Sequence, residues 1–235
     1  MSEIIQTSLD IEVHPPKLVT EYASTILRAP SKTMVVLKKS LTERTGPLFQ
    51  DFYLGALDHD LTKNSIKDGE PIGERIVVHG TVRNEKGEPI PNTIIEIWQA
   101  NAAGRYVHKV DQHDAPLDPN FLGTGRCLTD AQGNYKFYTI KPGAYPWGNH
   151  YNAWRPNHIH FSLFGNQISS RLITQMYFPG DPLLEYDPIY NAVKAKGREL
   201  LVSKFDLDIT EPNFALGYRF DIVLRGNYAT PFENL

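Results

Sequence analysis

Residues 145–164 decide how the rest of this chain is interpreted, and they read YPWGNHYNAWRPNHIHFSLF. The last seven of them combine aromatic and β-branched side chains in a short run that follows turn-forming residues, which predicts a β-strand. Side chains i and i+2 project from one face of a strand, so His158 and His160 are expected to share a face while Ile159 points to the other. Two imidazoles aimed at one point favour a metal site. The alternative is two ordinary strand histidines that hydrogen bonds satisfy.

The composition restricts the classes of function that the chain can have. Its 235 residues suit one domain with an extension or two small domains, and 41% hydrophobic and 22% charged residues are ordinary for a globular protein. A net charge of −3 provides no basic surface for nucleic acid or an anionic membrane. The single cysteine, Cys127, excludes an internal disulfide and a cysteine-based metal cluster. No stretch approaches transmembrane length and the first residues lack a basic n-region, so we expect a cytoplasmic protein.

The chain is predicted to divide near residue 72. Residues 1–72 are interrupted repeatedly by proline and glycine, which predicts an extended N-terminal arm whose candidate helix is residues 18–27. An arm this long is expected to wrap its own core or a partner chain. Residues 73–235 are predicted to form one β-sandwich domain.

Short apolar runs separated by turn formers predict an all-β fold for this domain. The predicted strands are residues 75–83, 93–99, 125–129, 135–140, 158–164, 173–178, 200–205 and 217–224. The turn formers of residues 130–134 predict a hairpin between the third and fourth strands. One helix is predicted at about residues 188–196. Close spacing of short strands favours a core of two packed sheets with long loops, one short helix and the extended arm.

A long motif in residues 78–106 resembles the signature of the intradiol ring-cleavage dioxygenases. The matching residues are Val78-His-Gly-Thr-Val82, Gly87, Ile90, Ile95-Glu-Ile97 and Gly104-Arg-Tyr106. The chain is also similar to this family at Tyr145-Pro-Trp147, Trp154-Arg-Pro156 and His158-Ile-His160, and in the arm over residues 41–49. The resemblance covers the core from about residue 74 to residue 224. It implies that residues 73–235 are a catalytic domain.

The resemblance implies one non-haem Fe(III) ion per chain, with Tyr106, Tyr145, His158 and His160 as its ligands. Ferric iron is a hard cation that suits phenolate oxygen and also imidazole, and a bound metal lowers the pKa of a tyrosine ligand strongly. No carboxylate has an obvious claim to the alternative pattern of two histidines and one carboxylate. Other interpretations stay open: zinc or copper at the histidine pair, Tyr106 as a surface ring, and Tyr145 as a packing residue.

The resemblance implies roles for residues beside the metal. Tyr145 is similar to the ligand that leaves when substrate binds and then acts as a base. Arg155 is similar to an arginine whose charge stabilises negative charge on the reacting ring, and the alternative is a structural ion pair. Gln175 resembles a polar residue near that ring, and Trp147 is expected to wall the substrate pocket. Tyr22, on the arm, resembles a residue that helps to hold a substrate carboxylate.

The implied reaction is intradiol cleavage of a catecholic acid, protocatechuate, by O2 to give 3-carboxy-cis,cis-muconate. Catechol and hydroxyquinol are the alternative substrates, but the enzymes that cleave them carry a helical N-terminal region, and residues 1–72 are too broken for one. The resemblance also implies a homologous α chain in a higher-order hetero-oligomer, which supplies the main positive group for the substrate carboxylate. The alternative from another class is a metal-free β-sandwich binding module that has lost the chemistry.

Overall fold

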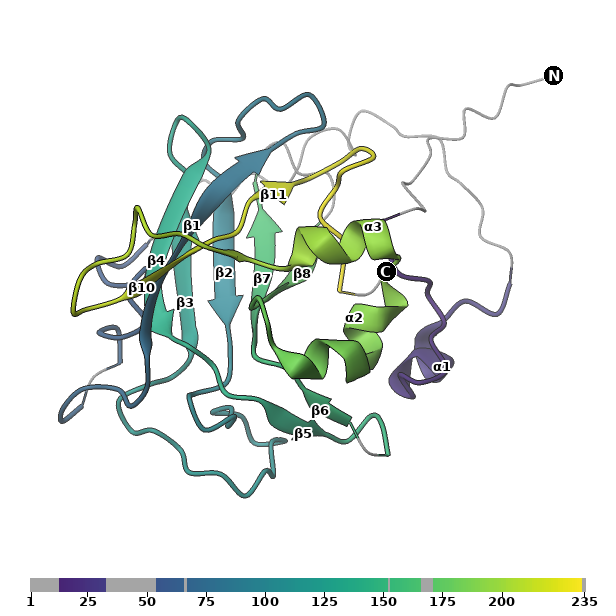
Figure 1. The fold of residues 1–235 in the computed structure, drawn as a ribbon, viewed down its shortest axis with the longest axis horizontal. Coiled ribbons are helices and arrows are strands. Elements are labelled where there is room, and N and C mark those ends of the chain that lie inside the picture. The colour runs from purple at the N-terminus through teal and green to yellow at the C-terminus, as the bar shows by residue number, and fades with distance from the viewer. Residues whose placement is uncertain (1–12, 33–53, 66, 152, 166–170, 234–235) are drawn as a thin grey trace.

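The computed structural model describes residues 13–32, 54–65, 67–151, 153–165 and 171–233, and most of its strands form two packed sheets (Figure 1). The arm motif at residues 41–49 lies outside the described residues. The first sheet is built around a long central strand, β1 (Arg75–Arg83). Its other strands are β4 (Asn134–Ile140), β9 (Lys204–Phe205), β10 (Leu216–Arg219) and β11 (Ile222–Val223). β4 runs antiparallel to β1, whereas β10 and β11 run parallel to it.

The second sheet is antiparallel throughout and has the order β3-β2-β7-β8. These strands are β2 (Ile94–Trp98), β3 (Thr124–Leu128), β7 (His158–Phe164) and β8 (Leu172–Tyr177). The register places His160 opposite Trp98 of β2 and Gln175 of β8. It also places His158 opposite Tyr177. Side chains directly opposite each other project from the same face, so the register gathers aromatic and polar groups around the two histidines.

The hydrophobic core lies between the two sheets and is formed by side chains from alternate positions of the strands. On β7 the inward residues are Ile159, Phe161 and Leu163, all fully buried in that core. Burying each such side chain contributes about 1.5–3 kcal/mol, which fixes the register of the strand against slippage. His158 and His160 therefore project from the opposite face, as the alternation in the sequence predicts. The predicted β-sandwich is confirmed.

The predicted hairpin between the third and fourth strands is wrong, because β3 and β4 belong to different sheets. β3 pairs with β2, and β4 pairs with β1 over residues 75–81. Residues 130–134 still make a turn, in which Asp130 accepts hydrogen bonds from the backbone of Gln132 and Asn134. The turn carries the chain across the core. Pairing with the long β1 strand gives β4 more ladder hydrogen bonds than β3 offers.

The predicted helix at about 188–196 is two short helices, α2 (Pro188–Ala192) and α3 (Ala195–Arg198). Val193 separates them because its backbone is extended and its side chain packs with Tyr177 and Leu201. The C-terminal strands are also shorter than predicted. Residues 199–201 form a 3-10 turn ahead of β9, and Phe220 and Asp221 separate β10 from β11. A further 3-10 helix, η2 (Pro182–Tyr186), precedes α2.

Between β4 and β7, where no strand is predicted, the chain forms a small hairpin. Its strands are β5 (Tyr145–Trp147) and β6 (Ala153–Arg155), and they pair Tyr145 with Arg155. In the arm, the described helix α1 (Ser24–Arg28) is shorter than the candidate helix at residues 18–27. The backbone N–H of Ala23 donates to the Asn149 carbonyl near the end of the hairpin. The arm thus reaches the β5–β6 hairpin.

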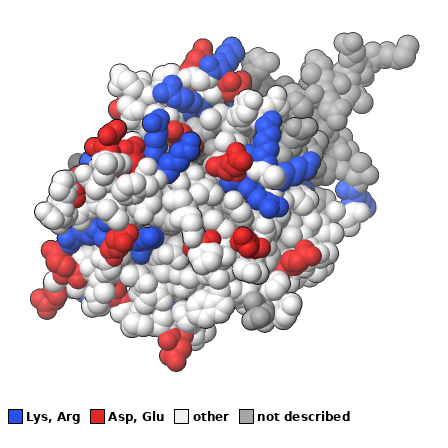
Figure 2. Space-filling model, viewed as in Figure 1, with Lys and Arg blue, Asp and Glu red and all other residues white. Residues whose placement is uncertain are grey.

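The surface carries no single-sign charge patch on the face drawn in Figure 2, where lysine and arginine alternate with aspartate and glutamate. This face therefore lacks the continuous positive field that favours nonspecific nucleic-acid binding. In the part of the chain that the structure describes, no helix has the length and apolar character to cross a membrane.

Candidate metal centre and active site

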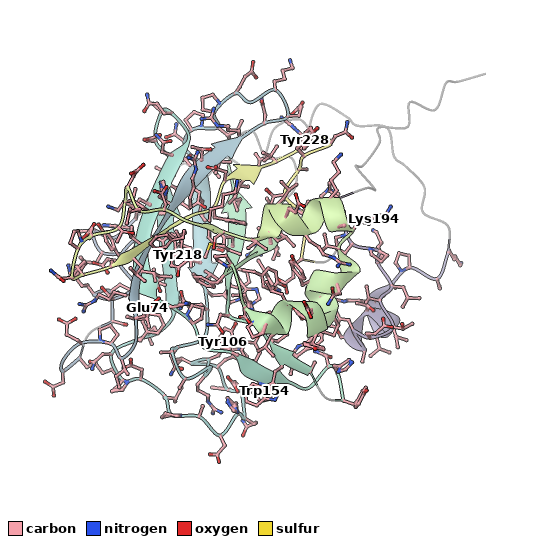
Figure 3. All side chains as sticks on the ribbon, viewed as in Figure 1. Glu74, Tyr106, Trp154, Lys194, Tyr218 and Tyr228 are labelled. Atoms are coloured by element: carbon pink, nitrogen blue, oxygen red, sulfur yellow. The ribbon has the colours of Figure 1, made fainter. Side chains whose placement is uncertain are left out.

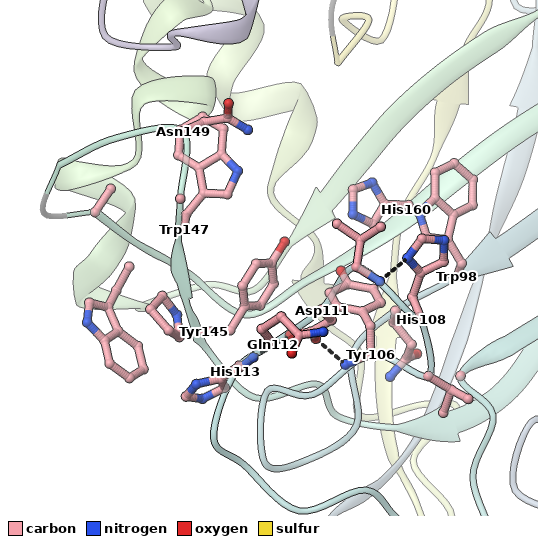
Figure 4. A pocket seen from close by; sticks show the side chains of 18 of the residues that line it. Trp98, Tyr106, His108, Asp111, Gln112, His113, Tyr145, Trp147, Asn149 and His160 are labelled. Carbon is pink, nitrogen blue, oxygen red and sulfur yellow. Dashed lines mark hydrogen bonds between the residues drawn. The ribbon is translucent and has the colours of Figure 1, made fainter.

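The four predicted ligands lie together. Figure 3 labels one of them, Tyr106, at the end of the sandwich that carries the β5–β6 hairpin and Trp154. The ring centroids of His158 and His160 are 4.8 Å apart, and those of Tyr145 and His158 are 5.5 Å apart. Tyr106 lies 5.3 Å from Tyr145 and 6.4 Å from His160, measured between ring centroids. Figure 4 shows Tyr106, Tyr145 and His160 side by side in the same pocket. The fold therefore brings two phenols and two imidazoles from three separate segments to one place.

Tyr106 is held by the conformation of its loop rather than by a strand. Its backbone N–H donates to Asp111 Oδ2 at 2.8 Å, one of the hydrogen bonds that close the loop (Figure 4). Gly104 adopts a φ of +79°, and a Cβ atom there would lie 2.1 Å from the carbonyl oxygen of Ala144. Only glycine allows the loop to approach the start of β5 this closely. The glycine two residues before Tyr106 thus lets the two tyrosines meet.

The two histidines present the same ring nitrogen to the site. His158 Nδ1 lies 2.6 Å from the Pro156 carbonyl oxygen, and His160 Nδ1 lies 3.1 Å from Glu233 Oε2. Both partners are acceptors, so each Nδ1 carries the proton and each Nε2 keeps its lone pair. His158 Nε2 lies 3.3 Å from the hydroxyl oxygen of Tyr145. Free Nε2 lone pairs on two neighbouring imidazoles are what a metal ion requires.

The environment favours the neutral forms of these side chains when no cation is bound. Burial holds the pKa of the Tyr106 hydroxyl well above its ordinary value, and the nearby Tyr145 adds to the effect. Burial also raises the pKa of Tyr145, although Arg155 acts in the opposite direction. Burial, with Arg155 and His160, holds the pKa of His158 well below its ordinary value. A neutral His158 is ready to bind a metal, whereas the two tyrosines need a cation to become phenolates.

The residues present fit a ferric ion. The hydroxyl oxygen of Tyr106 is buried and makes no hydrogen bond of acceptable geometry, which is costly unless a ligand satisfies it. In the described segments, no three His, Cys, Asp or Glu side chains are grouped so that they could hold a metal ion, so the pattern of two histidines and one carboxylate is not met there. Two phenol oxygens and two imidazole nitrogens could hold Fe(III), whose three positive charges suit anionic oxygen donors.

Arg155 is buried behind the tyrosines in a network that the sequence only partly predicts. It is 2% exposed and forms an ion pair with Asp187, with Nε 3.0 Å from Oδ1. The same guanidinium donates to Gln175 Oε1 and to the hydroxyl of Tyr177, and it lies 5.5 Å from the ring of Trp147. The structural ion pair, offered as the alternative for Arg155, is therefore present. It holds the guanidinium beside the candidate metal ligands.

A pocket of about 1240 Å³ opens in front of the four rings. Its lining includes Tyr106, Tyr145, His160, Trp98, Trp147 and Trp154. Arg155, Gln175 and His158 lie behind this lining, each at most 2% exposed. Tyr22 does not line the pocket but contacts Trp147 edge-on, with 4.7 Å between ring centroids. The predicted residues are thus near one another, with Tyr22 at the outer side of Trp147.

Three residues of the site escaped the sequence analysis. Trp98 stacks on His160 with 4.7 Å between ring centroids and 5° between ring planes. Asp187 is fully buried against Arg155, and Glu233 contacts His160. Trp98 lies near the end of the strand predicted at residues 93–99, so pairing that strand with β7 would have found it. Asp187 and Glu233 sit in irregular segments, where no periodicity indicates which way a side chain points.

Comparisons with known proteins identify relatives of this chain. A profile described as Dioxygenase matches residues 44–226. The chain is 62% identical over 232 residues to the protocatechuate 3,4-dioxygenase beta chain of Burkholderia cepacia, with 99% of both chains covered. It is 31% identical over 179 residues to the protocatechuate 3,4-dioxygenase alpha chain of Pseudomonas putida, covering 74% of this chain and 83% of the relative. Its fold resembles that of 3-chlorocatechol 1,2-dioxygenase from Rhodococcus opacus 1CP, with a TM-score of 0.57 at 22% identity, covering 86% and 77% of the two chains.

Proposed function

The chain belongs to the intradiol dioxygenase family, and we propose on that premise that it cleaves protocatechuate at a ferric ion bound by Tyr106, Tyr145, His158 and His160. The observation that carries this proposal is the convergence of these four rings on one place, where three of them line the pocket and His158 lies directly behind. The reaction joins both atoms of O2 to the two hydroxylated ring carbons, breaks the bond between them and releases two protons. The product is 3-carboxy-cis,cis-muconate.

Iron, when bound, supplies Lewis acidity and the electronic contact that makes the diol reactive towards O2. The protein residues position the diol and accept its protons. Tyr145 is the proposed proton acceptor, because it lines the pocket and would be a phenolate once the cation is bound. Tyr106 is the proposed permanent ligand, since its loop is fixed through Asp111 and Gly104. The walls formed by Trp98, Trp147 and other aromatic rings limit the access of water.

Arg155 is the proposed source of electrostatic stabilisation. Its guanidinium is almost fully buried and fixed by Asp187, so its charge is not screened by water and needs no reorganisation during the reaction. Gln175 is placed by the same network, because its Oε1 accepts from Arg155 and from Tyr177. The Nε2 of Gln175 is buried without a hydrogen bond of acceptable geometry. We infer that Gln175 acts on the reacting ring through this network, because it lies behind the pocket lining and its amide lies beside the Glu233 carboxylate.

The substrate carboxylate is proposed to lie towards Trp147 and Tyr22, at the outer side of the pocket. Tyr22 contacts Trp147 and also lies under the guanidinium of Arg28, whose Cζ is 4.8 Å from its ring centroid. A carboxylate that enters an apolar pocket requires a cation or several donors. We propose that an α chain of the same fold completes this part of the site, in keeping with the names of the two protocatechuate 3,4-dioxygenase relatives. The division into an arm of residues 1–72 and a catalytic domain of residues 73–235 remains part of the proposal.

The experiment is to produce the chain alone and together with its α chain, and to measure protocatechuate-dependent O2 uptake. We expect one O2 consumed per protocatechuate by the two-chain assembly and little or no uptake by the single chain, because the carboxylate then lacks its cation. The carboxylated product should carry both oxygen atoms of ¹⁸O-labelled O2. Full-rate cleavage of protocatechuate by the chain alone would contradict the partner proposal. Cleavage of catechol but not of protocatechuate would assign the alternative substrate.

A further inference from the structure

Residues 226–233, here called the C-terminal segment, are fastened to β8 and end at the candidate metal centre. The hydroxyl of Thr174 donates to the Pro231 carbonyl at 2.6 Å, and the backbone N–H of Glu233 donates to the Ile173 carbonyl at 2.8 Å. The backbone N–H of Phe232 donates to His14 Nδ1 of the arm at 3.3 Å. The two bonds to β8 lie at Ile173 and Thr174, immediately before Gln175, so the segment is positioned by the same strand that carries part of the active site.

The side chain of Glu233 turns from this segment towards the back of His160. Its Oε2 lies 3.1 Å from His160 Nδ1, and the two side chains are 14% and 9% exposed. A carboxylate that is so little hydrated requires a specific partner to remain charged.

The contact decides which way the imidazole of His160 faces. The stacked ring of Trp98 restricts the plane of the imidazole, but a rotation of 180° about Cβ–Cγ preserves that stack. The rotation would move Nδ1 away from Glu233 and exchange Nε2 with a carbon at the site. The hydrogen bond to Glu233 therefore favours the orientation in which Nε2 faces Tyr106 and His158.

We propose that Glu233 is a positioning residue that orients His160 and strengthens it as a metal ligand, an inference that rests on the iron site proposed above. A carboxylate that accepts the Nδ1 proton raises the basicity of the opposite nitrogen. Among the described residues, the acceptor for His158 Nδ1 is the neutral carbonyl of Pro156. The two imidazoles therefore differ in donor strength, and the stronger one depends on a residue 73 positions further along the chain.

The test compares Glu233→Ala and Glu233→Gln with the unmodified protein, each isolated in its natural assembly. Ferric affinity is measured by competition with nitrilotriacetate, and the visible band of iron-bound phenolate is recorded. We expect Glu233→Ala to weaken ferric binding by about 10- to 100-fold and to shift the band. Glu233→Gln should lose less affinity, because its amide oxygen accepts the same proton without the charge.

The matched control is Glu85→Gln, which removes a carboxylate that binds Arg225, the residue directly before the C-terminal segment. Glu85 Oε2 accepts a hydrogen bond from Arg225 Nε at 3.0 Å. Neither of these two residues is a candidate ligand. Ferric affinity in Glu233→Ala within twofold of the unmodified protein would overturn the proposal, and so would an equal loss in Glu85→Gln. If the unmodified protein itself binds no ferric ion, the proposed iron site fails instead. If the unmodified protein shows the visible band of iron-bound phenolate and neither Glu233 variant changes it, the positioning role is rejected but the iron site is not.

Discussion

Replacing His160 with alanine is expected to remove both the iron and the activity. The side chain supplies one of four candidate donors, and Tyr106, Tyr145 and His158 alone would leave the ion with too few protein ligands. Oxygen uptake with protocatechuate should fall below detection, and metal analysis should find less than one-tenth of the wild-type iron. We do not expect misfolding to cause this loss, because His160 projects away from the hydrophobic core that Ile159 and Phe161 fill.

The matched control for this variant is His79→Ala. His79 Nε2 also contacts a carboxylate, Asp206 Oδ2 at 2.8 Å, but the pair lies on the first sheet and away from the pocket. The control should retain its iron, its colour and its turnover. Full iron content and turnover in His160→Ala would contradict the assignment of His160 as a ligand.

The second large effect is expected for Arg155→Ala, which should retain iron but lose turnover. Loss of one preorganised electrostatic group commonly reduces kcat by about 10²–10³-fold. The substitution also leaves Asp187 buried without its cation, and breaking such a pair commonly costs about 3–5 kcal/mol of stability. Both effects are expected here, so a fall in activity alone would not separate catalysis from folding.

A double variant, Arg155→Ala with Asp187→Asn, separates the two roles. The asparagine removes the unpaired charge and still offers an oxygen to the backbone N–H of Ile189, which Asp187 caps. We expect the double variant to recover much of the lost thermal stability, to retain the visible band and to remain as slow as Arg155→Ala. Recovery of turnover together with stability would show that Arg155 acts only as a structural partner of Asp187.

The sequence predicts the sandwich and the ligand face because both depend on local pattern. Alternation along residues 158–164 places Ile159 in the core and His160 on the other face, whichever strands lie beside them. Strand pairing is not local, which explains the wrong hairpin. β3 and β4 are neighbours in sequence, but β3 pairs with β2 and β4 pairs with β1. The helix at 188–196 is divided because tertiary packing of Val193 outweighs helix propensity.

The four candidate ligands could be proposed from sequence because they lie in separate segments that each resemble the intradiol dioxygenases, whereas their supporting residues could not be proposed. Asp187 precedes a proline in a segment of short helices, and its direction is set by burial against Arg155. Glu233 reaches His160 through a segment without regular secondary structure. Trp147 and Tyr22 meet only because the arm returns to the β5–β6 hairpin. Contacts of this kind depend on the finished fold and leave no periodic signal in the chain.

The visible absorption spectrum of the purified protein tests the central claim most directly. Phenolate bound to Fe(III) absorbs visible light, so the account predicts a coloured protein whose band disappears when a chelator removes the iron. Tyr106→Phe and Tyr145→Phe should each weaken and shift that band, since both hydroxyl oxygens belong to the proposed ligand set. A colourless protein that contains zinc, or a band that neither tyrosine substitution changes, would contradict the proposed ferric site.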